Sequence, residues 1–254
     1  MDVQLFLPFV ILAFFCELVD STLGMGYGTT LTPLLLLMGY EPAQIVPAVL
    51  LSECFTGVLA GVFHHEFGNV NLRPGTRDFK VMLVMSGLSV VGVLLAVGIA
   101  INVPAWAIKL YIGVLVLSIG VGVLILMRRK QPIAFSWRRI AGLGFLAAFN
   151  KGLSGGGYGP VVTGGQVLAG VSGASAIGIA SLAEGVASAV GVVAYLASGA
   201  PFPWLLAPSL VLGAVFSVPF AAFLVSRIST NRLTLAIGSV TTLLGGYTLV
   251  RLML

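Results

Sequence analysis

The chain has 254 residues, of which 58% are hydrophobic and 8% are charged, and its formal net charge is +5. A soluble domain has about a quarter of its residues charged, so this composition excludes an ordinary soluble protein. The positive charge does not indicate nucleic-acid binding, because the basic residues lie in short loops between apolar segments, as in the cytoplasmic loops of membrane proteins.

In chain order, the apolar segments span residues 3–22, 28–39, 43–64, 79–101, 105–127, 139–152, 158–171, 173–197, 204–226 and 232–252. Most of them are long enough to cross about 30 Å of hydrocarbon as a helix, but 28–39 and 158–171 are too short. The pattern predicts an all-α polytopic protein of the cell membrane, whereas a β-barrel would show alternating runs of about ten residues. We expect one integral membrane domain over residues 1–254, with a first helix that is retained rather than cleaved.

The chain contains an internal duplication. A shift of 131 residues places Tyr27 on Tyr158, Gly28 on Gly159 and Glu53 on Glu184 without a gap. The matches of Tyr and Glu are informative because the chain has few residues of either kind. Repeat 1 is therefore expected over about 1–127 and repeat 2 over about 139–254, joined by a basic cytoplasmic loop at 128–138.

The two repeats differ in where their charges lie. The loop at 65–78 carries Arg73 and Arg77, while the equivalent loop at 198–203 carries no basic residue. Conversely, the link at 227–231 is flanked by Arg227 and Arg232, while the equivalent link at 102–104 has no basic residue. If basic loops are cytoplasmic, the repeats have opposite orientations and both termini lie outside the cytoplasm. Inverted repeats of this kind are typical of secondary transporters.

Each short segment follows a glycine-rich break with the pattern G-x-G-Y-G. Free backbone groups cannot face lipid, so such a break must lie within protein or line a wet cavity. A short helix beginning near Thr29 or Pro160 would point its N-terminal N–H groups inward, which favours an anion. Two inverted copies would bring these helix ends together near the membrane midplane. The alternative interpretation is close helix packing through small residues.

The candidate substrate-binding residues are Gly24, Gly26, Tyr27, Gly28, Thr29, Asn150, Lys151, Ser154, Gly155, Gly156, Gly157, Tyr158 and Gly159. Lys151 is a cation within an apolar segment, where charge is costly and usually functional. Two roles remain open for it: binding the anion, or pairing with Asp20, the residue that corresponds to it in repeat 1.

Asp20, Glu53 and Glu184 are candidate functional carboxylates within apolar segments. A carboxyl group in a low-dielectric interior is more easily protonated, so these side chains are candidates for proton coupling or for structural hydrogen bonds. His64 and His65 are adjacent, which is a poor arrangement for a metal ligand pair, and we place them at the membrane interface. We expect no metal, no cofactor and no enzymatic activity.

The segments "STLGMGYGTTLTPLLLLMG" and "NKGLSGGGYGPVVTGGQVLAG", with the paired Glu helices, resemble the sulfite exporter TauE/SafE-like permeases. The resemblance implies a transporter of small sulfur-containing anions, such as sulfite, thiosulfate or organosulfonates, with the glycine breaks at the site. The expected partners are this anion and the lipid bilayer; proton coupling and a homodimer are left open. The competing hypotheses are an anion channel and a transporter of another small organic anion.

Overall fold

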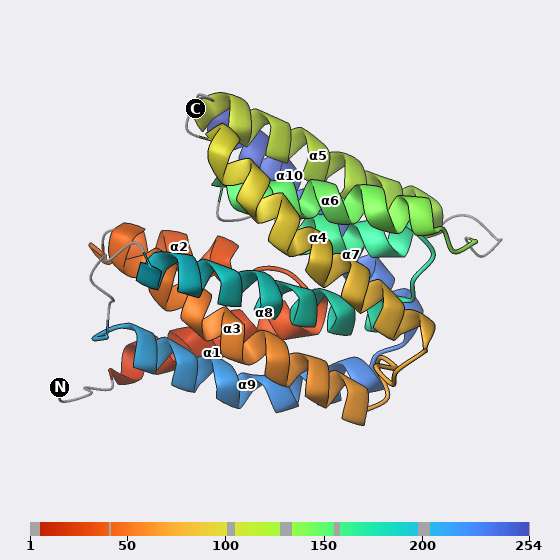
Figure 1. The fold of residues 1–254 in the computed structure, drawn as a ribbon, viewed down its shortest axis with the longest axis horizontal. Helices are drawn as coiled ribbons and strands as arrows, with labels where there is room; N and C mark the ends of the chain where they lie inside the picture. Colours follow the sequence, from red (N-terminus) through yellow and green to blue (C-terminus); the bar gives the residue numbers. More distant parts are fainter. Residues whose placement is uncertain are drawn as a thin grey trace.

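The structure is a computed structural model that describes residues 6–40, 42–100, 105–127, 134–154, 158–197 and 204–253. These residues form helices and no strand (Figure 1). The helices are α1 (Leu7–Leu23), α2 (Tyr27–Leu37), α3 (Pro42–Glu66), α4 (Arg77–Ala100), α5 (Ala105–Met127), α6 (Trp137–Ser154), α7 (Tyr158–Leu168), α8 (Gly173–Ala197), α9 (Ala207–Arg227) and α10 (Thr230–Met253). The all-α class predicted from the sequence is confirmed.

Several of these helices have the length and apolar composition of membrane spans. In the described part of the chain, four qualify over Gln44–Glu66, Gly173–Ala197, Ala207–Arg227 and Asn231–Leu252. The apolar stretch Gly113–Ile125 within α5 is shorter. These helices support a multi-pass membrane protein.

The helices α2 and α7 are half-helices of 11 residues each. At 1.5 Å per residue, each is roughly 16 Å long, about half the thickness of the hydrocarbon core. Their shortness agrees with the sequence prediction, but each begins at the tyrosine of its G-x-G-Y-G pattern, two residues earlier than we expected. The first break is therefore limited to Gly24–Gly26.

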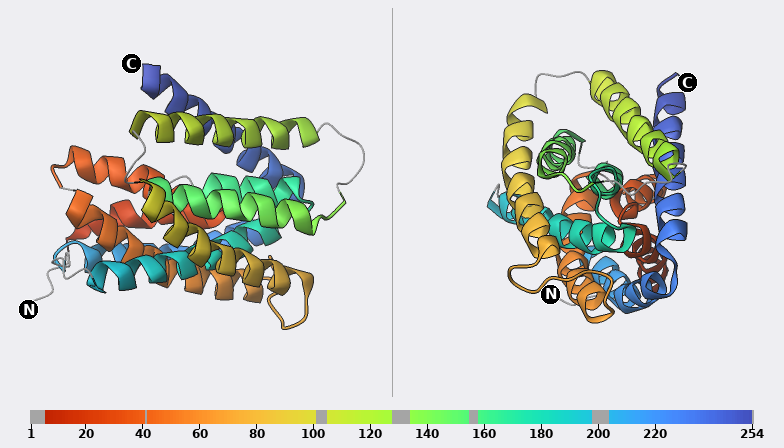
Figure 2. Two further views of the ribbon diagram at one scale, coloured as in Figure 1. Left: turned by 45° about the horizontal axis from the view of Figure 1, so that its top comes forward. Right: turned by 90° about the vertical axis from the view of Figure 1, so that its right-hand side faces the viewer.

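The helices pack in pairs that repeat between the two halves of the chain. The bounds of α2 and α3 recur 131 residues later in α7 and α8. The helix α1 corresponds to α6, and α4 to α9. Accordingly, α1 packs against α9 and α6 packs against α4, while α3 packs against its counterpart α8 and α5 against α10 (Figures 1 and 2). This pattern fits a duplicated unit. The opposite orientation of the two copies in the membrane stays a prediction.

Glycine allows the closest of these helix contacts. A Cβ atom on Gly57 of α3 would lie 2.5 Å from both the Cα atom of Gly185 and the carbonyl oxygen of Ser181 on α8. Close backbone approach through small residues is how membrane helices gain packing energy without a hydrophobic driving force between them. The glycine-rich composition therefore contributes to the packing as well as to the breaks.

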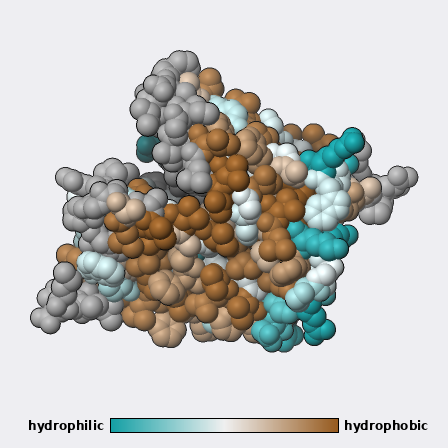
Figure 3. Space-filling view, viewed as in Figure 1, coloured by the Kyte–Doolittle hydropathy of each residue, from teal (hydrophilic) through white to brown (hydrophobic). Residues whose placement is uncertain are grey.

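Four connections meet at one end of the bundle. Val70, Val171, Ile228 and Phe135, one from each connection, share a hydrophobic cluster there, and the guanidinium of Arg77 lies 5.1 Å from the Phe135 ring centroid. Figure 3 shows hydrophilic residues gathered at this end, on the right, while the face in view is otherwise mostly apolar. Most of the exposed basic residues in the described part of the chain belong to these connections or to the adjoining helix ends: Arg73, Arg77, Lys80, Arg138, Arg139, Arg227 and Arg232. Arg251, in the last turn of α10, is also exposed.

Candidate functional site

The first break is a glycine turn that ends α1. Gly24 has φ +71°, and its N–H donates to the carbonyl of Asp20 at 2.6 Å. Gly26 has φ +129°, which a residue with a side chain rarely adopts. The chain then enters α2 at Tyr27. The glycines thus let the backbone leave one helix and begin another within three residues.

The N-terminus of α2 already holds a carboxylate. The backbone N–H of Tyr27 donates to Oδ1 of Asp20 at 3.1 Å, in a buried position. A carboxylate is the preferred group at this place, because the first N–H groups of a helix lack partners and the helix dipole is positive there. This bond explains why α2 begins at Tyr27. It also means that the helix end is chemically an anion site, occupied here by a side chain of the same protein.

The second half-helix, α7, extends from this break to the end of the bundle that carries most of the exposed basic residues, here called the basic end. The C-terminus of α7 lies at that end, where Arg139 donates to the carbonyl of Leu168 at 2.9 Å. Further into the bundle, Thr163 of α7 donates to the carbonyl of Gly24 at 2.7 Å. A Cβ atom on Gly159 would lie 2.7 Å from the Cα atom of Met25. The start of α7 therefore packs directly on the first break.

The two tyrosines of the breaks are buried braces. The Tyr27 hydroxyl shares a hydrogen bond of 2.8 Å with Ser52 of α3. The Tyr158 hydroxyl shares one of 2.5 Å with Ser89 of α4. Each bond ties the first turn of a half-helix to a long helix and fixes where its N-terminus lies.

A small acidic cavity lies beside the first break, between α1, α3 and α8. Its lining residues are Glu17, Asp20, Glu53, Thr56, Gly57, Ser181 and Glu184. The chain has eight acidic residues, so half of them line this one cavity. Its volume of about 10 Å³, counted for the centre of a water molecule, is close to the minimum for one water. The three carboxylates identified from the sequence are thus brought together, with a fourth.

Glu53 lies next to the start of α2. Its Oε2 accepts a hydrogen bond of 3.0 Å from Ser188 of α8. Its Oε1 is only 3.2 Å from the position that a Cβ atom of Gly28 would take. The glycine at position 28 therefore makes room for a carboxylate at the N-terminus of the half-helix.

Glu17 is the site residue that the sequence analysis missed. It is 2% exposed and lies one turn before Asp20 and Ser21 on α1. Its Oε1 accepts a hydrogen bond of 2.5 Å from Ser21, but its Oε2 is buried with no hydrogen-bond partner among the described residues. Glu17 falls on Ala148 at the repeat shift, so the search for shared residues passed over it. Its charge within an apolar segment was the available signal.

His64 is fully buried in the protein, in the last turn of α3. The expected place of His64 and His65 at the membrane interface stays a prediction. Its Nε2 lies 3.0 Å from the carbonyl oxygen of Ser21, and its Nδ1 lies 3.0 Å from Nδ2 of Asn69. Asn69 Nδ2 also donates to the carbonyl of Ala222 at 2.7 Å, which fixes its amide orientation. A carbonyl only accepts and an amide nitrogen only donates, so His64 is neutral with its proton on Nε2. The burial itself was not foreseen, because the Ser21 carbonyl comes from 43 residues away in the sequence.

Several predicted site residues lie outside the described residues. Gly155, Gly156 and Gly157 are not described, and neither are the side chains of Thr29, Asn150, Lys151 and Ser154. The anion-binding and ion-pairing roles suggested for Lys151 therefore stay predictions. The described part of the site consists of the first break, the beginnings of both half-helices and the acidic cavity.

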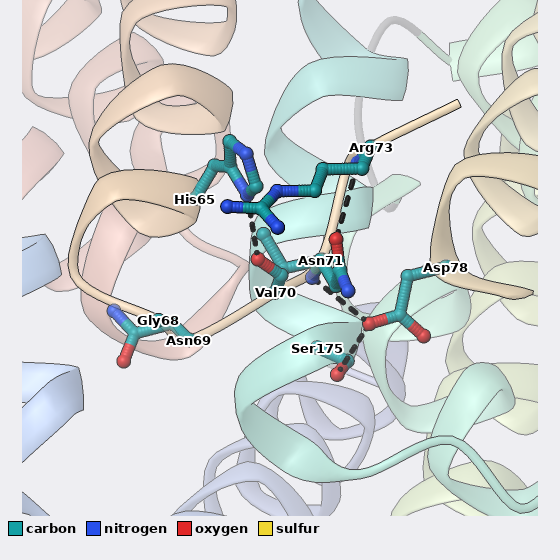
Figure 4. Close-up of a pocket in the computed structure, with 8 residues that line it drawn as sticks. All are labelled: His65, Gly68, Asn69, Val70, Asn71, Arg73, Asp78 and Ser175. Atoms are coloured by element: carbon teal, nitrogen blue, oxygen red, sulfur yellow. Dashed lines mark hydrogen bonds between the residues drawn. The ribbon is translucent and has the colours of Figure 1, made fainter. Parts of the chain in front are cut away.

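A second, open pocket lies at the basic end, with a volume of about 360 Å³. Figure 4 shows Asp78 between Asn71 and Ser175 in this pocket. One carboxylate oxygen of Asp78 accepts from the Asn71 N–H at 3.2 Å and from the Ser175 hydroxyl at 3.0 Å. These bonds join the loop after α3 to the starts of α4 and α8 and so hold the three elements together.

Comparison with known proteins agrees with this architecture. The family model described as "Sulfite exporter TauE/SafE" matches residues 9–248. The chain is 29% identical over 254 residues to a protein of Bacillus subtilis (strain 168) described as "Probable membrane transporter protein YtnM". That match covers 95% of this chain and 82% of the relative. No solved structure matches the chain. The family match covers both breaks and the acidic cavity, so this polytopic helical chain belongs to the sulfite exporter TauE/SafE family.

Proposed function

We propose that the chain is a secondary transporter of the cell membrane that moves a small sulfur-containing anion, such as sulfite, thiosulfate or an organosulfonate, by alternating access. Both termini would lie outside the cytoplasm. The observation that carries the proposal is the carboxylate of Asp20 on the N-terminus of α2. The description of the family supports the choice of a sulfur oxyanion as the substrate.

In this proposal, the transported anion replaces Asp20 at the N–H groups of α2. An oxyanion offers the same kind of acceptor oxygen as a carboxylate and gains the same interaction with the helix dipole. The start of α7 packs on the break, so movement of one half-helix against the other would expose the site to one side at a time. For an anion that crosses without a coupled proton, the membrane potential, negative inside, favours outward movement by about 2.3 kcal/mol per charge per 100 mV.

A small organic carboxylate is a second candidate substrate. The helix end accepts the carboxylate of Asp20 in this structure, so acetate-like anions fit the same chemistry. The two candidates are separated by measuring the thermal unfolding of the purified protein with sulfite, thiosulfate, methanesulfonate, sulfate and acetate. An anion that binds only the folded protein, present at a concentration of 100 times its Kd, raises the free energy of unfolding by about 2.7 kcal/mol.

The variant Asp20→Asn tests the replacement directly. Asparagine keeps an oxygen for the Tyr27 N–H but removes the negative charge that competes with the anion. The charge at a helix N-terminus contributes about 0.3–2 kcal/mol, so we expect the best anion from the screen to bind about 2- to 30-fold more tightly. Glu66→Gln, at an exposed position at the end of α3, is the matched control and should leave the affinity unchanged. Unchanged or weaker binding by folded Asp20→Asn would contradict the proposed site.

A further inference from the structure

The side chain of Glu17 is the least satisfied polar group in the acidic cavity. Ser21 donates to Oε1, while Oε2 is buried without a hydrogen-bond partner among the described residues. Leaving a buried acceptor unpaired costs about 1–3 kcal/mol, and more if it is charged. Such an atom, on a side chain that lines a cavity, indicates a ligand that binds there during part of the cycle.

The chemistry of the cavity indicates that this ligand is a cation. Four of its lining side chains are carboxylic acids, and the other lining residues are Thr56, Gly57 and Ser181. The volume accommodates about one water. Within the described ranges, no three His, Cys, Asp or Glu side chains are placed to share a metal ion. A proton fits these constraints better than a metal cation, because it needs one oxygen atom and no coordination shell.

The charged groups around Glu17 come from several helices. Asp20 lies one turn away on the same helix, Glu53 faces it from α3 and Glu184 from α8. The phenol of Tyr27, on α2, is also close enough to interact electrostatically with Glu17. The side chain of Lys151 lies outside the described residues. Carboxylates that line one buried cavity disfavour each other's ionised form, so added negative charge in the cavity favours protonation of one of them.

We propose that Glu17 binds a proton when the transported anion displaces Asp20 from the N-terminus of α2. This inference rests on the proposed function. Asp20 already lines the cavity. Once displaced, its carboxylate loses the Tyr27 N–H that offsets its charge, so the negative potential around Glu17 rises. A proton from the water on the side of anion entry then bonds to Oε2 of Glu17, and no other covalent bond forms or breaks. On release of the anion, Asp20 returns to the Tyr27 N–H and Glu17 gives the proton to the water on the opposite side.

The inference assigns different roles to Glu17 and Glu53. Glu53 is held at Oε2 by Ser188, and its Oε1 lies beside Gly28 at the start of α2, which fits a structural role. Glu17 has an oxygen available for a proton and lies on the helix that carries Asp20. One proton would accompany each monovalent anion, so transport would be electroneutral and independent of the membrane potential.

The test measures proton uptake by the full-length protein in weakly buffered detergent solution with a pH-indicator dye. Methanesulfonate is the probe, because its charge stays constant across the neutral pH range. The wild type is expected to take up about one proton for each methanesulfonate bound. Glu17→Gln, which mimics the protonated side chain, should bind methanesulfonate without proton uptake, while Glu17→Asp should retain uptake. Glu66→Gln, the exposed control, should behave as wild type.

A second variant keeps the test decisive if Glu17→Gln fails to fold. Ser21→Ala removes the hydrogen bond to Oε1 but keeps Glu17, so it should shift the pH midpoint of uptake; an unmoved midpoint overturns the inference. Unchanged uptake in folded Glu17→Gln, or methanesulfonate binding that requires sodium, also overturns it. If the wild type binds methanesulfonate without proton uptake, the inference fails while the proposed function stands. If the wild type binds none of the screened anions, the proposed function fails with it.

Discussion

The contact of Gly57 with Gly185 makes one substitution especially informative. Gly57 lies where α3 meets α8, and it also lines the acidic cavity. In Gly57→Ala, the new Cβ atom would lie 2.5 Å from the Gly185 Cα atom, whereas ordinary contact begins at 3.4 Å. The atoms in its way are backbone, so the two helices must separate by almost 1 Å.

Two effects of opposite sign decide the stability of this variant. Alanine is a better helix former than glycine by about 1 kcal/mol, which stabilises α3. Overpacking a tight contact costs about 1–3 kcal/mol. Gly87 of α4 isolates the second effect, because a Cβ atom there meets nothing within 4 Å. The free energies of unfolding of the two alanine variants should therefore differ by about 1–3 kcal/mol, with Gly57→Ala the less stable.

The measurement is thermal unfolding of both variants in the same detergent, followed by circular dichroism. For a chain of this size, about 1 kcal/mol corresponds to about 2–4 °C in Tm. The Tm of Gly57→Ala should therefore lie about 2–12 °C below that of Gly87→Ala. If Gly57→Ala has an equal or higher Tm, the close contact of α3 with α8 does not exist in the folded protein, and the cavity beside it must be placed differently.

Three further predictions concern the site and the topology. Gly26→Ala forces a side chain to φ +129°, which costs about 1–3 kcal/mol; anion flux into proteoliposomes should fall, and normal flux would contradict the need for this backbone shape. Lys151→Met should weaken anion binding by about 30-fold to several-thousand-fold if Lys151 contacts the substrate; near-normal affinity in the double variant with Asp20→Asn would leave only an ion-pairing role. Cysteines placed at Gly75 and Gln131 should resist membrane-impermeant thiol reagents in intact cells, and labelling of either from outside would overturn the inverted orientation.

The sequence was sufficient for features that depend on local pattern. The shortness of α2 and α7 followed from the lengths of their apolar segments, because an 11-residue helix cannot cross the hydrocarbon core. Three of the four carboxylates of the cavity were also found: Glu53 and Glu184 because they match at the repeat shift, and Asp20 because it precedes the first glycine break. The start of α2 was placed two residues too late, because the bond from Tyr27 to Asp20 joins residues seven apart across a turn.

Other features depend on contacts that no local pattern contains. The position of His64 near a helix end gives no sign that its ring is buried against Asn69 and the Ser21 carbonyl. Glu17 has no counterpart in repeat 2, so the duplication that identified Glu53 and Glu184 gave it no support. A residue that occurs in only one repeat is not found by a comparison that selects the residues shared by both repeats.

The bond between Asp20 and the Tyr27 N–H also bears on how strongly a transported anion can bind. A competitor attached to the same chain acts at a local concentration in the millimolar range or above. The apparent Kd of the transported anion is its intrinsic Kd divided by the fraction of molecules whose site is vacant, so a mostly occupied site binds the anion more weakly. Under the proposed function, the tethered carboxylate of Asp20 weakens the apparent affinity for the transported anion. It also promotes release of the anion, since it reoccupies the helix end.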